Sequence, residues 1–286
     1  MNKLLRLLAL ATASILMIAP AAALDLKLKD KIVLVTGSTS NIGYATARLF
    51  LREGATVIVN SNDPAAVTAA IDSLRKETGR TPLGFTADVT KAEDIAKLVA
   101  AHPRVDVLVN NVGGMIASDF LQSTDKQWDD SWQLNVMSGV RLSRQYLPGM
   151  RERNWGRVIF ISSESGLQIP TESIAYGAVK AAVIATARGL AEINAGTGIT
   201  VNSILPGPTW DRDGQRAKAA LQRSGAKSFE EMEKNFITQR RPTSLIQRFA
   251  SPDEVAALIV YTAGEAASAT TGAALRVDGG VVKSAF

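Results

Sequence analysis

Tyr176 and Lys180 are four residues apart in the run Tyr-Gly-Ala-Val-Lys, which has helical spacing. Residues at i and i+4 share one helix face, so the phenol and the ammonium would lie side by side. A free tyrosine has a pKa of about 10 and is a poor acid or base at neutral pH. A nearby ammonium favours the phenolate and would lower that pKa toward a useful range. We therefore predict that these two side chains transfer a proton.

Ser163 ends an earlier strand-like run, where its hydroxyl could bond a substrate carbonyl. Singly, each of these residues has an ordinary explanation. A Tyr-x-x-x-Lys spacing often arises by chance, and a serine after a strand is commonly a helix cap. The combination of the three residue types is much less common and favours proton transfer at a carbonyl or alcohol.

The composition excludes several rival chemistries. The chain of 286 residues has no cysteine, which excludes disulfides, thiol nucleophiles and thiolate metal sites. Its single histidine, His102, lies in a short polar connector, which argues against a serine hydrolase and against a metal site built on several imidazoles. We predict no metal. The net charge of +5 is spread among acids without a dense basic run, so we expect no nucleic-acid partner.

Apolar, β-branched runs alternate with helical patterns along the chain. Such alternation predicts a parallel sheet covered on both faces, with ligands at the carboxyl ends of the strands. The fold class is α/β: a Rossmann-type doubly wound parallel sheet of about seven strands in a single domain, residues 24–286. The predicted strands are 32–35, 56–59, 83–86, 105–109, 157–161, 199–204 and 274–277. The predicted helices are 42–52, 64–77, 92–101, 126–150, 174–194 and 252–262.

The segment 206–241 breaks this alternation because it is polar and longer than most connections. We predict that it is a lid over the substrate. Its basic residues could meet an acidic carrier protein, whereas Asp211 and Asp213 fit a solvated helix equally well.

The run Thr36-Gly-Ser-Thr-Ser-Asn-Ile-Gly43 joins the first strand to the first helix. Glycines there allow a tight turn and let a pyrophosphate approach the amides at the helix start. Asn41 stands where many such turns have glycine, and asparagine tolerates a left-handed backbone better than most residues. The run predicts a dinucleotide site.

The residue at the end of the second strand indicates which of the two nicotinamide cofactors, NAD or NADP, is bound. An acid there bonds the ribose of NAD and repels the 2′-phosphate of NADP. Here the residues are Asn60-Ser61-Asn62, with Asp63 one step later and without the usual arginine. The neutral groups favour NADP, with NAD as the alternative.

These motifs occur in the order typical of the short-chain dehydrogenase/reductase family, which the sequence resembles from about Leu28 to Val281. Within that family it is most similar to 3-oxoacyl-carrier-protein-reductase-like members. The separation of 13 residues between Ser163 and Tyr176 (176 − 163) is the usual one in the family. The other matching segments are Asp88-Val89, Asn110-Asn-Val-Gly113, Asn135, Ile161-Ser-Ser163, Pro206-Gly-Pro-Thr209, Thr271-Gly272 and Val277-Asp-Gly-Gly280.

The resemblance implies an NAD(P)-dependent oxidoreductase acting on a small carbonyl or alcohol, with an acyl thioester among the candidate substrates, as a homodimer or homotetramer. Tyr176 would be the acid in reduction and the base in oxidation, Lys180 would lower its pKa, Ser163 would polarise the carbonyl, and Asn135 would hold a proton-relay water. A non-catalytic NADP sensor is the alternative, although such proteins typically lose Tyr or Lys. The predicted cofactor residues are Gly37, Ser38, Ser40, Asn41, Ile42, Gly43, Ser61, Asn62, Asp88, Val89, Asn110, Val112, Gly113, Tyr176, Lys180, Pro206, Gly207 and Thr209.

Residues 1–23 have the form of a secretory signal peptide, with a basic start, an apolar run from Leu7 to Ile18 and small residues before Leu24. Cleavage after Ala23 or retention as an anchor would place the protein in the periplasm or at a membrane. Alternatively, translation begins near Leu24, because Leu24-Asp-Leu-Lys-Leu-Lys-Asp-Lys resembles the usual start of family members, and the protein is then cytoplasmic.

Overall fold

The computed structural model describes residues 24–116, 119–212 and 214–285. Seven strands form one parallel sheet in the order β3-β2-β1-β4-β5-β6-β7. Their bounds are β1 Ile32–Val35, β2 Thr56–Ser61, β3 Leu83–Thr86, β4 Val107–Asn110, β5 Gly156–Ile161, β6 Ile199–Pro206 and β7 Ala274–Val277. The order reverses beside β1, where β2 and β4 lie on opposite sides. The predicted doubly wound sheet of seven strands in a single domain is confirmed.

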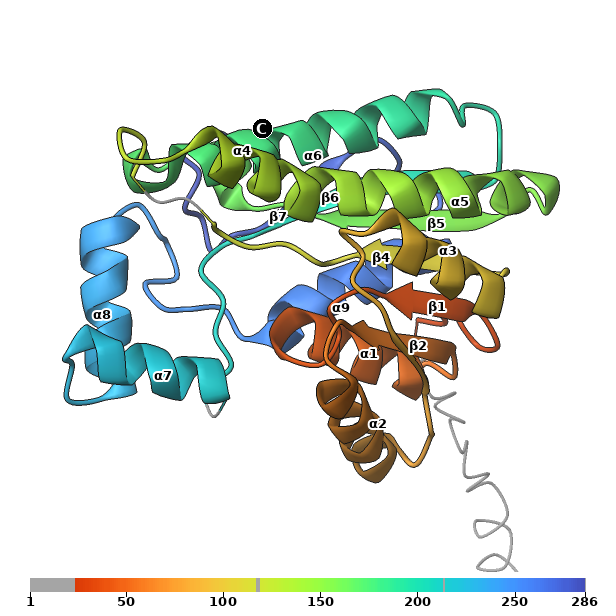
Figure 1. Cartoon of the computed structure of the whole chain (residues 1–286), viewed down its shortest axis with the longest axis horizontal. Coiled ribbons are helices and arrows are strands. Elements are labelled where there is room, and N and C mark those ends of the chain that lie inside the picture. The colour runs from red at the N-terminus through yellow and green to blue at the C-terminus, as the bar shows by residue number, and fades with distance from the viewer. Residues whose placement is uncertain (1–23, 117–118, 213, 286) are drawn as a thin grey trace, which may run out of the picture.

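Helices cover both faces of the sheet (Figure 1). One layer holds α1 (Asn41–Arg52), α2 (Pro64–Thr78) and α9 (Pro252–Ala263). The other holds α3 (Ala92–Ala101), α4 (Asp125–Trp132), α5 (Ser138–Glu152) and α6 (Ile174–Glu192). Two apolar clusters lie between the sheet and these layers, one including Phe50 and Leu74 and the other including Leu108 and Met150. Because helices bury both faces of the sheet, the central strands β1 and β4 are almost wholly apolar and do not alternate.

The predicted helix over 126–150 is divided. A π-helical turn at Gln133–Met137 separates α4 from α5, and it carries Asn135. Such turns insert one extra residue and are frequent at functional sites. Helical periodicity in the sequence does not reveal them, because the apolar stripe continues on either side.

Strand β4 begins at Val107 and not at the predicted Val105. The Asp106 carboxylate accepts a hydrogen bond from the Ile32 amide at 3.0 Å, while the Asp106 amide donates to the Ile32 carbonyl at 2.8 Å. A side chain therefore takes one of the ladder bonds at this point, and regular pairing starts one residue later.

The segment 206–241 contains α7 (Gln215–Ser224) and α8 (Phe229–Arg240), which stand beside the sheet at one end of the molecule (Figure 1). They have a small apolar cluster of their own around Met232, Ile237 and Phe249. Ser228 caps α8 by accepting from the Glu231 amide, and Arg212 bridges Glu230 and Glu233. The ion pairs of Arg212 within the segment favour a self-supporting helical unit. Its role as a lid stays a prediction.

Candidate active site

The turn after β1 is shaped by backbone that only certain residues adopt. Gly37 has a φ of 60° and Asn41 a φ of 51°, both in the left-handed region. The prediction that Asn41 would preserve the turn there is confirmed. At Gly43 an added Cβ would lie 2.4 Å from the Gly37 carbonyl oxygen, so the start of α1 and the turn approach as closely as glycine permits.

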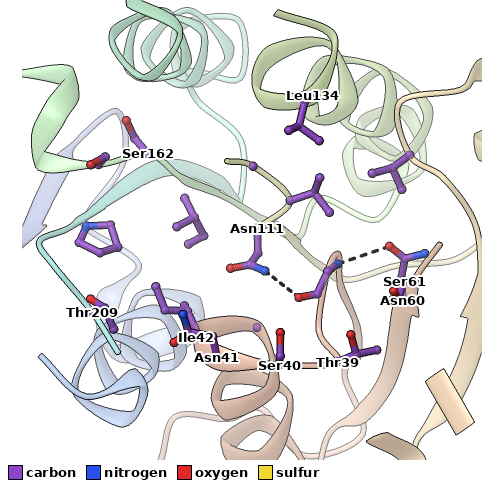
Figure 2. A pocket seen from close by; sticks show the side chains of 18 of the residues that line it. Thr39, Ser40, Asn41, Ile42, Asn60, Ser61, Asn111, Leu134, Ser162 and Thr209 are labelled. Atoms are coloured by element: carbon purple, nitrogen blue, oxygen red, sulfur yellow. Dashed lines mark hydrogen bonds between the residues drawn. The ribbon is translucent and has the colours of Figure 1, made fainter. Parts of the chain in front are cut away.

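Two asparagines hold this turn from neighbouring strands. Asn111 donates from Nδ2 to the Thr36 carbonyl at 2.8 Å. It also donates to the Gly37 carbonyl at 3.1 Å, and Asn60 accepts from the Gly37 amide at 3.4 Å (Figure 2). Asn60 also donates to the Phe85 and Ala87 carbonyls. Neither Asn60 nor Asn111 is in the predicted site. The signal was available for Asn111, because an amide directly after a buried strand can reach the neighbouring turn.

A cleft of about 450 Å³ opens at the carboxyl ends of the strands. Sixteen of the eighteen predicted cofactor residues line it, from the Gly37–Gly43 turn through Ser61, Asp88 and Gly113 to Thr209. Its lining also includes residues that were not predicted: Thr39, Asn60, Ala87, Asn111, Leu134, Ile161 and Ser162.

Ser38 and Asn110 are the two predicted cofactor residues that do not line the cleft. The Ser38 hydroxyl accepts from the Asn60 amide at 3.0 Å and is fully buried, so it ties the turn to β2. Asn110 points into the α5 layer, where it donates to Ser143 at 3.3 Å. Asn110 ends β4, and the alternation of side chains along a strand turns it away from the cleft.

The end of the cleft near β2 is neutral. Ser61 and Asn62 line it, whereas the carboxylate of Asp63 is used as the N-cap of α2 and accepts from the Ala65 and Ala66 amides. Asp63 is not among the lining residues of this cleft. This side of the cleft therefore has no carboxylate at the position that would bond a ribose hydroxyl.

Ser163, Tyr176 and Lys180 line the other end of the cleft together. Lys180 is buried, its Nζ donates to the Ile161 carbonyl at 3.0 Å, and the same atom lies 5.5 Å from the centre of the Tyr176 ring. Helix α6 thus presents both groups toward the carboxyl end of β5, as the four-residue spacing indicates.

Asn135 lies behind Gly113 and does not line the cleft. Its side chain accepts from the Gly114 amide at 3.0 Å and donates to the Gly114 and Ser131 carbonyls. A Cβ at Gly113 would lie 2.7 Å from Lys180 Nζ and 2.8 Å from Asn135 Oδ1. Glycine there lets Asn135 and Lys180 approach the same point, which fits the predicted shared proton relay.

The electrostatics of Tyr176 differ from the prediction. Burial, reinforced by the charge of Glu164, raises the pKa of Tyr176 to about 12, and the Ser163 hydroxyl and the Arg241 charge oppose this shift. Lys180 is not a cause of the shift; burial lowers its own pKa to about 8. Desolvation is a property of the fold, so a spacing argument that considers charge alone predicts the wrong direction here.

Glu164, the residue after Ser163, is buried at 4% exposure and was not in the predicted site. Its carboxylate accepts a hydrogen bond from the Ser163 hydroxyl and is paired with Arg241, 2.8 Å from Nε to Oε1. A carboxylate accepts but does not donate, so the single hydroxyl proton of Ser163 is directed at Glu164. The predicted bond from Ser163 to a substrate carbonyl requires that hydroxyl to rotate.

Because Lys180 is buried, replacing it should make the protein more stable. Its pKa falls from 10.5 to about 8 on folding, so the unfolded chain binds more protons between those pH values. Stability linked to this group is therefore lowest below pH 8 and recovers as the pH rises toward 10.5. We expect Lys180→Met to raise the free energy of unfolding at neutral pH by on the order of 1–3 kcal/mol.

Urea denaturation of the protein and of Lys180→Met, at neutral pH and again at a pH near 10, measures this effect. The gain should shrink at the higher pH, and activity should be lost at both. A variant that is less stable at neutral pH would contradict the account of Lys180 as a strained, functional charge.

Within the described residues there is no group of three or more His, Asp or Glu side chains placed to hold a metal ion. His102 ends α3 and packs edge-on against Phe85. Burial lowers its pKa, and it does not line the cleft.

Comparison with known proteins places this cleft in a family. The family model described as "Enoyl-(Acyl carrier protein) reductase" matches residues 37–282. An uncharacterized oxidoreductase, YvrD, of Bacillus subtilis strain 168 is 42% identical over 264 residues, covering 91% of this chain and all of the relative. D-beta-hydroxybutyrate dehydrogenase of Cupriavidus necator is 31% identical and covers 89% of this chain and 99% of the relative.

Among solved structures, L-sorbose reductase of Gluconobacter frateurii, in complex with NADPH and L-sorbose, superposes with a TM-score of 0.84. It is 30% identical and covers 91% of this chain and all of that chain. Together with the cleft and its Ser163, Tyr176 and Lys180 group, these matches show that the chain belongs to the short-chain dehydrogenase/reductase family of NAD(P)-dependent oxidoreductases.

Proposed function

We propose that the protein is an NADP(H)-dependent reductase of a small carbonyl substrate with an apolar portion, and that Tyr176 donates the proton. The observation that carries the proposal is the convergence of Ser163, Tyr176 and Lys180 on one end of the dinucleotide cleft. A nucleotide sensor would need only the end of the cleft that holds the nucleotide, so the presence of Ser163, Tyr176 and Lys180 favours catalysis.

The glycine turn is the part of the chain that would hold the cofactor pyrophosphate, since the contacts at Gly43 leave no space for a side chain there. The bound nicotinamide supplies the hydride. In the proposed reduction, Tyr176 gives its phenol proton to the carbonyl oxygen as negative charge develops there. Lys180, together with a water held by Asn135, would return a proton to Tyr176, since both side chains lie next to Gly113. A phenol with a pKa of about 12 remains protonated at neutral pH, which suits the reducing direction.

The substrate side is a second cleft of about 760 Å³. Met115, Phe120, Leu121 and Phe236 form its apolar part, and Thr171–Ser173 border it just before the helix that carries Tyr176. The charged residues Asp119, Arg240 and Arg241 also line it. Leu121 and Phe120 are largely exposed. Exposed apolar side chains around a cleft favour a substrate that covers them, such as a ketone or 3-oxoacyl thioester with a hydrocarbon chain.

The proposal is tested by following NADPH and NADH oxidation with a panel of sugars, aliphatic ketones, diketones and 3-oxoacyl thioesters. We expect turnover with NADPH and an apolar carbonyl. Binding of NADPH without turnover of any panel member would favour the sensor. Failure to bind either nucleotide, measured by nucleotide fluorescence, would refute both.

Cofactor choice is expected to depend on Ser61. An aspartate at the end of β2 would add a carboxylate where the 2′-phosphate of NADPH is expected to lie. We expect Ser61→Asp to weaken NADPH binding on the order of tenfold or more and to leave NADH binding equal or stronger. Fluorescence titration of both nucleotides against both proteins measures the ratio. An unchanged ratio would show that the 2′-phosphate lies elsewhere.

We also propose that the chain forms a homodimer or homotetramer. Strand β7 is a sheet edge, and Tyr261 of the adjoining α9 is 41% exposed. An edge strand presents backbone N–H and C=O groups that can pair with another chain. Analytical ultracentrifugation gives the assembly size.

For location, we propose export or membrane anchoring through residues 1–23, which lie outside the described residues. The basic and apolar pattern of that segment supports this. Sequencing the N-terminus of the natural protein, together with cell fractionation, distinguishes cleavage after Ala23, a retained anchor and a start near Leu24.

A further inference from the structure

A buried chain of polar contacts runs from the catalytic hydroxyls to the end of the segment 206–241. The Ser163 hydroxyl bonds one oxygen of Glu164, and Arg241 Nε bonds the other at 2.8 Å. The side chain of Glu164 is 5% exposed and that of Arg241 is 13% exposed. An ion pair so far from solvent is weakly screened and is felt by its neighbours.

Arg241 is held firmly in this position. It follows α8, its amide donates to the Ile237 carbonyl at 2.9 Å, and its guanidinium lies 5.9 Å from the Phe236 ring. Its Nη1 also contacts Glu172 at 3.3 Å, and Glu172 is 3.5 Å from Arg240. Such extensive fixation of a buried guanidinium aims one nitrogen at Glu164 and leaves it little freedom.

In this series of polar contacts, each side chain is held by the next one. The Ser163 hydroxyl donates its one proton in a hydrogen bond to Glu164, and its oxygen accepts from the Ser165 amide at 3.1 Å. The more closely Arg241 holds the Glu164 charge, the less that charge opposes a phenolate at Tyr176. The Glu164–Arg241 pair lies close enough to Ser163 and Tyr176 to affect proton transfer as well as packing.

We infer that Glu164 and Arg241 are positioning residues: Arg241, through Glu164, sets the direction of the Ser163 hydroxyl and the ease with which Tyr176 releases its proton. The inference rests on the proposed role of Tyr176 as proton donor. Because Arg241 directly follows α8, the Arg241–Glu164 ion pair connects the docking of the segment 206–241 to the state of the catalytic hydroxyls.

The two charges of the ion pair have opposite effects on the pKa of Tyr176. Glu164 raises its pKa and Arg241 lowers it, while Lys180 lies on the same helix. Glu172 and Arg240 lie one contact further out, on Arg241 and Glu172 respectively. Removing the Arg241 charge should thus raise the pKa of Tyr176, and removing the Glu164 charge should lower it.

The test is a titration of Tyr176 that needs no substrate. Protein with 13C-labelled tyrosine rings contains four such signals, and Tyr176→Phe identifies the one of interest. We expect Glu164→Gln to shift this titration down by on the order of one pH unit and Arg241→Met to shift it up by a similar amount. The double variant should lie near the unsubstituted protein, and Arg241→Lys should restore most of the change.

Arg248→Met is the matched control, because Arg248 makes an equally close pair with Glu254 at the surface and does not line either cleft. It should leave the titration unmoved. With the alcohol that corresponds to the best carbonyl substrate of the panel, the rise of kcat/KM for oxidation with pH should move in the same directions as the titration.

A lower melting temperature in the Arg241 variants without any shift of the Tyr176 titration would reduce the pair to a structural clasp and overturn the inference. Glu164→Gln alone decides the matter if Arg241→Met does not fold, since an amide of the same shape keeps the Ser163 contact. Shifted titrations in a protein that reduces no carbonyl would leave the inference standing and refute the proposed function instead.

Discussion

Replacing Tyr176 by phenylalanine is expected to lower kcat for carbonyl reduction by about three orders of magnitude, while NADPH binding and the melting temperature change little. The phenol proton is the group that neutralises the developing alkoxide, and phenylalanine removes it without changing the ring. Because Tyr176 lies on α6 with its ring close to Lys180 Nζ, the loss of one oxygen should not disturb the helix.

Stopped-flow and steady-state measurements on the variant separate the chemical step from binding, with nucleotide fluorescence reporting Kd. Tyr146→Phe is a suitable control, because the Tyr146 hydroxyl donates to the His102 carbonyl at the end of α3. Tyr146 does not line the cleft. General acids typically contribute on the order of a hundredfold or more to the rate. If Tyr176→Phe keeps about a tenth or more of the parent kcat, Tyr176 is not the general acid.

Replacing Gly43 by alanine is expected to weaken nucleotide binding by about a hundredfold and to destabilise the protein by about 1–3 kcal/mol. The new Cβ would stand 2.4 Å from the Gly37 carbonyl oxygen and 2.6 Å from Asn111 Nδ2. Either the turn moves away from α1 or Asn111 releases it. Both responses change the amides that face the pyrophosphate.

Gly189→Ala provides the control in the same protein. A Cβ at Gly189 on α6 meets nothing within 4 Å, so the substitution should stabilise the helix by up to about 1 kcal/mol. Thermal melts with and without NADPH compare the two variants. Equal nucleotide protection in Gly43→Ala and the parent would show that the turn does not hold the cofactor.

How much could be predicted from the sequence varies with the kind of feature. The strands and most helices follow from apolar runs and caps, and the Gly37–Gly43 turn follows from its glycines. The π-helical turn at Asn135 does not, because a five-residue segment between two helices is too short for its different periodicity to stand out in the sequence. Likewise Ser38 is correctly placed in the turn, but its direction away from the cleft depends on contacts with β2.

The site shows the same division. Ser163, Tyr176 and Lys180 are recognisable because their types and spacing are local properties of the chain. Glu164 stands next to Ser163 in the sequence, yet its partner Arg241 is 77 residues away, and no local pattern joins them. Asn111 and Thr36 are likewise 75 residues apart.

The sequence by itself thus determined which groups can move a proton, which turn can hold a dinucleotide, and the alternation that builds a parallel sheet. Tertiary structure decided how those groups titrate and what steadies them. Burial, which arises only when distant segments pack, raises the pKa of Tyr176 and lowers that of Lys180. The direction of a pKa shift depends on desolvation as much as on a neighbouring charge, and only the folded chain contains both.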